Sequence, residues 1–86
     1  MPRISAFYGV EIYMYFRDHA PPHFHAIYGE HEAAVQIQSG NVMEGELPKT
    51  ATKLVKRWAR QRAQELMTDW ELAQLEQPLN WIPPLD

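Results

Sequence analysis

Residues 23–38 read HFHAIYGEHEAAVQIQ and predict a β-hairpin. Apolar side chains recur at every second position on both sides of Gly29-Glu30, which is the spacing of half-buried strands. Glycine in the first turn position favours a two-residue type II′ turn. That turn pairs Tyr28 with His31, and it sets the register of two strands, 23–28 and 31–38.

This register separates the hairpin side chains into two faces. The first face collects Phe24, Ala26, Tyr28, Ala33, Val35 and Ile37. The second face collects His23, His25, Ile27, Glu32, Ala34 and Gln36. A three-residue turn would mix apolar and polar positions, because a one-residue slip moves every side chain to the other face. We therefore expect both histidines on the sheet face that points away from a packed helix.

The chain before the hairpin alternates with the same period of two. Val10, Ile12, Met14 and Phe16 point to one side of a predicted strand, 10–17, while Glu11, Tyr13, Tyr15 and Arg17 point to the other. Pro21-Pro22 ends this segment, since proline lacks an N–H group. After the hairpin, a short fourth strand around Val42–Leu47 fits the pattern.

The C-terminal half has helical periodicity over residues 49–76. An apolar arc faces one side of this region, and its centre rotates markedly after residue 62. An unbroken helix of this length would extend about 42 Å, which overshoots so small a sheet. We expect a bend or break between Arg62 and Asp69, where Thr68-Asp69-Trp70-Glu71 resembles a capping box.

These elements predict an α+β fold in one domain, residues 1–86. A three- or four-stranded antiparallel sheet within residues 4–47 would be covered on one face by a long, bent helix. The proline-bearing tail, 77–86, is apolar enough to lie back on the fold. The three tryptophans, Trp58, Trp70 and Trp81, are expected in the core.

Composition excludes several classes of protein. Apolar residues make up 45% of the 86-residue chain, which argues against disorder. Without cysteine there is no disulfide, no thiolate nucleophile and no cysteine-built zinc site. No apolar run is long enough to span a membrane, and no secretory signal is visible, so a cytoplasmic location is expected.

The segment from Arg17 to His25 holds the first candidate site. Two imidazoles at positions i and i+2 of a strand can chelate one divalent metal ion such as zinc. The candidate ligands are His23 and His25, with Asp18, His19 or Glu32 as a third. The same pair could act as general acid and base in catalysis, with Arg17 nearby. A structural role, in which these polar residues pack on the tyrosines and bond the proline loop, is the preferred interpretation.

Two surfaces are candidates for binding a partner. The outer sheet face presents Tyr13, Tyr15 and Arg17 and could stack nucleic-acid bases, but neighbouring glutamates favour a protein-facing or dimer surface. The predicted helix carries a second surface, which we call the basic face: Lys49, Lys53, Lys56, Arg57 and Arg60. Bases at a helix N-terminus oppose the macrodipole, and salt bridges to the acidic strands, a phosphate backbone or an acidic partner protein would compensate them. A solvated charged face is the default interpretation of such a pattern. Arg62, Glu65 and Asp69 are spaced for a local salt-bridged seam.

The motif Pro21-Pro22-His23-Phe24-His25-Ala26 resembles that of a small bacterial family catalogued as domain of unknown function 4160. The resemblance covers nearly the whole chain, and His19 also falls on the family motif. It implies a gene neighbour encoding another small protein, and a toxin–antitoxin-like pairing has been suggested for such couples. No catalytic residue or cofactor is established for the family.

We therefore expect a binding or regulatory component with a small protein partner, or a homo-oligomer, and no membrane association. One alternative is a nuclease or hydrolase that uses His23 and His25, with or without metal. The other alternative is a protein that binds nucleic acid through the basic face.

Overall fold

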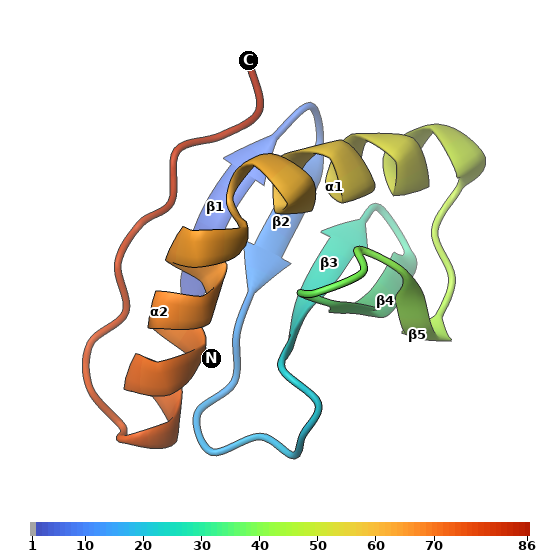
Figure 1. Cartoon of the computed structure of the whole chain (residues 1–86). Helices are drawn as coiled ribbons and strands as arrows, with labels where there is room; N and C mark the ends of the chain where they lie inside the picture. The colour runs from blue at the N-terminus through green and yellow to red at the C-terminus, as the bar shows by residue number, and fades with distance from the viewer. Residues whose placement is uncertain (1) are drawn as a thin grey trace.

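The computed structural model describes residues 2–86 and contains five strands and two helices. They are β1 (Arg3–Phe7), β2 (Val10–Tyr13), β3 (His23–Tyr28), β4 (His31–Gln36), β5 (Val42–Gly45), α1 (Lys49–Gln61) and α2 (Ala63–Gln74). All five strands form one antiparallel sheet in the order β1-β2-β3-β4-β5, and α1 crosses one face of it (Figure 1). The predicted α+β class is confirmed.

The number of strands was predicted wrongly, because β1 was not recognised as a separate strand. β1 pairs with β2, but its register shifts between Arg3 and Ser5. Ile4 and Ser5 are both buried at this irregularity, so the side chains of β1 do not follow the strict alternation that identifies a strand in a sequence.

The β3–β4 hairpin has the predicted register. Tyr28 lies opposite His31 and Phe24 lies opposite Val35. Gly29 has a φ of 59°, and a positive φ at the first turn position is what a type II′ turn requires.

The strand predicted over residues 10–17 is too long, since β2 ends at Tyr13. Beyond it, the Arg17 N–H bonds the carbonyl oxygen of Ala73 in α2 rather than a neighbouring strand. Arg17 has a φ of 53°, which is incompatible with a strand. Phe16, which was predicted on the apolar face, is consequently exposed.

The helical region is broken, as the rotation of its apolar arc predicted. Arg62 separates α1 from α2 with φ −115° and ψ 22°, well away from helical values. The predicted capping box is wrong: Thr68 lies inside α2, where its hydroxyl donates to the Gln64 carbonyl oxygen 3.1 Å away.

One apolar cluster holds the sheet, the helices and the tail together. Trp58 of α1 lies at its centre, with ring centroids 5.2 Å from Phe7 and 5.6 Å from Phe24. The tail runs back past α2, and the Ile82 N–H bonds the Ile4 carbonyl oxygen at the edge of β1 (Figure 1). Ile82 is buried, but Trp81 is 54% exposed, so its expected place in the core is wrong.

Within residues 2–86, neither helix has the length and apolar character that crossing a membrane requires.

Candidate functional site

A carboxylate and two imidazoles meet where the β2–β3 loop folds back over the start of β3. The Asp18 Oδ2 atom lies 2.8 Å from His23 Nε2 and 3.4 Å from His25 Nε2. One ligand-type atom from each residue lies within 4.8 Å of the other two. We call this group the Asp18–His23–His25 cluster.

The end of α2 positions the loop that carries Asp18. The Arg17 N–H bonds the Ala73 carbonyl oxygen at 3.2 Å, and the Gln74 side-chain amide donates to the Asp18 carbonyl oxygen at 3.3 Å. These two bonds flank the carboxylate, so the cluster depends on contacts between segments far apart in the sequence.

His23 is only 2% exposed, which corrects the expectation that both histidines lie on an open sheet face. Its register is the predicted one, opposite Gln36, but the loop and α2 cover this end of the sheet. The ring centroid of Trp70 lies 5.3 Å from that of His23. His25 is nearer the surface, against the ring of Tyr15 at a centroid distance of 4.2 Å.

Both histidines turn Nε2 towards Asp18 and Nδ1 towards another oxygen. His23 Nδ1 lies 2.7 Å from the Pro21 carbonyl oxygen, which can only accept, so Nδ1 carries a proton and donates. His25 Nδ1 lies 3.7 Å from Glu32 Oε2. The two Nε2 atoms therefore converge on one carboxylate.

Several opposing effects act on the pKa of Asp18. Partial burial acts to raise this pKa. Hydrogen bonds from the His19 N–H, His25 and His23, together with the electrostatic effect of the His23 ring, outweigh burial and lower the pKa. Asp18 is therefore an ionised carboxylate near neutral pH, and it offers oxygen lone pairs to the cluster.

Two other predicted residues lie close to the cluster, and one does not. His19 is exposed, with Nε2 3.7 Å from Asp18 Oδ1, and Glu32 reaches His25 from β4. Arg17 instead points towards Glu76, with its Nη1 atom 3.4 Å from the Glu76 Oε2 atom. The structure therefore does not bring the Arg17 side chain together with the histidines.

The two predicted partner surfaces lie on opposite sides of the molecule. Tyr13 is on the sheet face opposite the core, where its hydroxyl donates to Glu11 Oε1 at 2.9 Å. The helix α1 packs on the core side and turns the basic face outwards. A ligand that binds the helix therefore does not reach the tyrosines.

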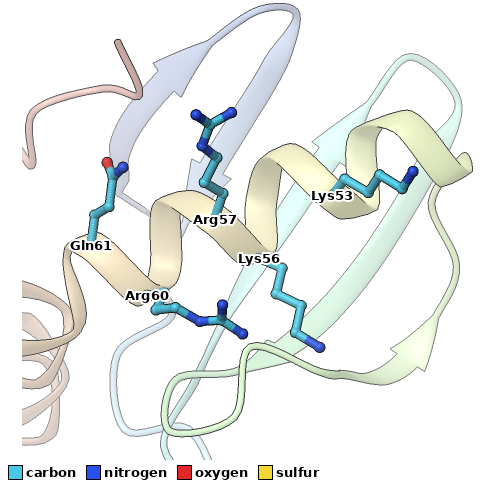
Figure 2. Close-up of a pocket in the computed structure, with 5 residues that line it drawn as sticks. All are labelled: Lys53, Lys56, Arg57, Arg60 and Gln61. Atoms are coloured by element: carbon cyan, nitrogen blue, oxygen red, sulfur yellow. The ribbon is translucent and has the colours of Figure 1, made fainter.

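The basic face forms a wide, shallow groove. Figure 2 shows Lys56 and Arg60 extending to one side of α1 and Arg57 to the other. Together with Lys53 and Gln61, they line a groove of about 350 Å³.

Among residues 2–86, none of the five bases of this face forms an ion pair, and Lys56 Nζ donates to Asn41 Oδ1 at 3.1 Å. The alternative in which acidic strands neutralise these bases is therefore wrong.

The seam expected of Arg62, Glu65 and Asp69 forms only in part. Arg62 Nη1 lies 3.2 Å from Glu65 Oε1, whereas Asp69 is fully buried and accepts the N–H of Asn80 in the tail. Burial raises the pKa of Asp69; the Asn80 N–H acts to lower it and the nearby charge of Glu65 to raise it. Asp69 is thus a link to the tail and not a member of an ion-pair network.

His23 bonds the proline loop through the Pro21 carbonyl oxygen, as the preferred interpretation expected. Sequence reasoning missed two groups that complete the cluster: Trp70, which lies near His23, and Gln74, which holds the loop. No local signal could have found them, because each contact depends on how the loop and α2 pack. Gln61 was detectable, since it follows Arg57 by one helical turn.

These features define a small α+β protein with a partly buried aspartate–histidine cluster on one side and a basic helix on the other. The chain belongs to the family described as domain of unknown function DUF4160, whose model matches residues 9–71. That range includes the cluster and all of α1. No curated protein and no solved structure matches the chain.

Proposed function

We propose that this protein is a binding or regulatory component that holds a small acidic protein partner against the basic face of α1. The observation that carries the proposal is that the five bases on one helix face form no ion pair with any acidic residue among the described residues.

The dipole of α1 disfavours one of these bases, Lys49, and favours Arg60, which lies in the last turn. The first turn of α1 has no acidic residue and begins with Lys49, at the end where the helix dipole disfavours positive charge. Each such position costs about 0.3–1 kcal/mol at low salt. An acidic partner that reaches the start of α1 would offset this cost.

The distribution of acidic residues favours a protein partner over a long nucleic acid. At 1.5 Å per residue, the 13-residue helix α1 presents a basic stretch only about 20 Å long. Glu44 and Glu46 precede it, Glu65 follows it, and the whole chain has a net charge of −3. The net negative charge of the chain disfavours a long phosphate backbone, whereas a short acidic segment of a protein needs only the basic stretch of α1.

The partner we expect is the small protein implied by the family resemblance, in a toxin–antitoxin-like pair. Co-expression followed by copurification of the full chain tests this pairing. Wild type and the variant Arg3→Glu/Arg17→Glu should retain the partner, and Lys53→Glu/Arg57→Glu should lose it. Both variants change the net charge equally, so equal retention by both would contradict docking on α1.

Growth separates a toxin from a passive partner. If the pair is toxin–antitoxin-like, expression of this chain alone arrests a bacterial host and the neighbouring gene product restores growth. Unimpaired growth would reduce the proposal to binding without toxicity. If light scattering of the chain without a partner gave the molar mass of a dimer, the homo-oligomer would be favoured instead.

The nuclease or hydrolase alternative has less support. His23 is buried, and both of its ring nitrogens already face oxygen atoms. Hydrolysis of DNA, RNA or a phosphodiester probe by wild type but not by His25→Ala would restore that alternative.

A further inference from the structure

We propose that Asp18, His23 and His25 form a binding site for a divalent transition-metal ion of the zinc class. This site is independent of the basic face, since it lies at the opposite side of the core. It therefore goes beyond the proposed function, and either proposal can fail without the other.

The spacing of the three atoms suits a tetrahedral ion. Zinc binds imidazole nitrogen and carboxylate oxygen at about 2.0–2.2 Å, so neighbouring ligand atoms lie about 3.3 Å apart. The two distances from Asp18 Oδ2, 2.8 Å to His23 Nε2 and 3.4 Å to His25 Nε2, lie on either side of this value. These two distances therefore suit one ion, and one ligand atom from each of the three residues lies within 4.8 Å of the other two.

The contacts around the imidazoles are those of metal ligands. A ligating histidine usually donates its other ring N–H to a carbonyl or carboxylate, which fixes the tautomer and orients the ring. His23 does so to the Pro21 carbonyl, and His25 has the Glu32 carboxylate beside its Nδ1. Each Nε2 is thereby directed towards the point where the ion would lie.

The ligand set selects the class of ion. Two imidazoles and one carboxylate suit Zn²⁺ and its transition-metal neighbours, while Mg²⁺ and Ca²⁺ prefer sites made wholly of oxygen ligands. Three protein ligands leave a fourth position, and the 68% exposed side chain of His19 stands next to it, with Nε2 3.7 Å from Asp18 Oδ1. The side chains of Asp18 and His25 are 16% and 14% exposed, so an ion can enter from this side.

The competing account is a metal-free ion pair in which Asp18 bridges protonated histidines and only fastens the loop. Titration of the tag-free, chelator-treated full chain with zinc chloride in a calorimeter separates the two accounts. We expect one saturable site in wild type and no comparable site for magnesium chloride. Absence of saturable zinc binding, or equal binding of magnesium, would overturn the proposal.

Two variants and a matched control locate the site. His25→Ala and Asp18→Asn each remove one ligand without emptying the buried His23 position. Each should weaken zinc binding by at least the roughly 10–100-fold that loss of an outer-shell partner costs. His31→Ala removes an exposed histidine of β4 outside the cluster and should bind zinc as wild type does.

The visible absorption spectrum of the cobalt complex distinguishes the proposed site from cobalt bound to surface histidines. The cobalt complex of wild type should show the intense visible bands of a four-coordinate ion, and those of His25→Ala should be lost while circular dichroism shows a folded chain. Equal zinc affinity in His25→Ala and His31→Ala would assign the binding to the surface and contradict the site.

Discussion

The indole Nε1–H of Trp58 donates a hydrogen bond to the carbonyl oxygen of Pro83, with 2.9 Å between nitrogen and oxygen. This bond ties the C-terminal half of α1 to the C-terminal tail. Trp58 is fully buried, so water cannot replace the tail as the acceptor. The tail is therefore part of the core, although it has no helix or strand of its own.

Trp58→Phe should destabilise the protein because it removes this bond and leaves a void beside Phe24. We expect a loss of about 1–3 kcal/mol in the free energy of unfolding, measured by urea denaturation. Trp81→Phe is the matched control, since Trp81 is largely exposed and should change stability by less than about 0.5 kcal/mol. Equal losses in both variants would contradict the role of the Trp58–Pro83 bond.

Gly45→Ala should disrupt the pairing of β5 with β4. Gly45 has a φ of 72°, and a Cβ there would clash with the backbone carbonyl oxygen of Glu32. We expect a loss of about 3 kcal/mol or more in the free energy of unfolding, from strain and overpacking together. Gly29→Ala has a similar φ but open space around it, so it should cost only about 1–2 kcal/mol. A smaller loss of stability for Gly45→Ala than for Gly29→Ala would contradict the close approach of Gly45 to the Glu32 carbonyl oxygen.

Asp69→Asn should stabilise the protein at neutral pH. Burial raises the pKa of Asp69 in the folded state above its unfolded value. The folded state therefore loses stability as pH rises from the unfolded pKa to the folded pKa, and the penalty persists above that. Asparagine removes the charge while keeping an acceptor for the Asn80 N–H.

Thermal unfolding of wild type and Asp69→Asn across pH 3–8 measures this effect. We expect the variant to have the higher Tm at pH 7, by about 4–8 °C for each kcal/mol, and the difference to shrink towards pH 3. If the Tm difference between the two proteins grew as pH falls, the result would contradict the raised pKa of Asp69 in the folded state.

His23→Ala should cost more stability than His25→Ala. Removing the buried His23 ring opens a void beside Trp70 and leaves Asp18 without its 2.8 Å hydrogen bond to the imidazole. We expect a loss of about 3–5 kcal/mol for His23→Ala and about 1 kcal/mol for His25→Ala, measured by urea denaturation. Similar small losses in both would restore the open-face placement that the sequence suggested.

The hairpin was predictable because its information is local. Gly29 identified the turn, and the alternation on both sides of it fixed which residues share a face. The break after α1 was predictable for the same reason, since the rotation of an apolar arc is visible within a few helical turns.

The cluster was only half predictable. The spacing of His23 and His25 placed both on one strand face, and Asp18 and His19 were named as neighbours. The burial of His23 could not be predicted from the sequence. Trp70 of α2 covers His23, and α2 lies about 45 residues further along the chain. Long-range packing of this kind also determined the exposure of Phe16 and Trp81.

The most direct test of the proposed function maps where the partner binds. In ¹H–¹⁵N correlation spectra of the labelled chain, titrated with the co-expressed partner, we predict the largest shifts at Lys53, Lys56, Arg57, Arg60 and Gln61. Single-stranded DNA at the same concentration should shift them less. Largest shifts at Tyr13, Tyr15 and His25, on the other side of the molecule, would contradict the account.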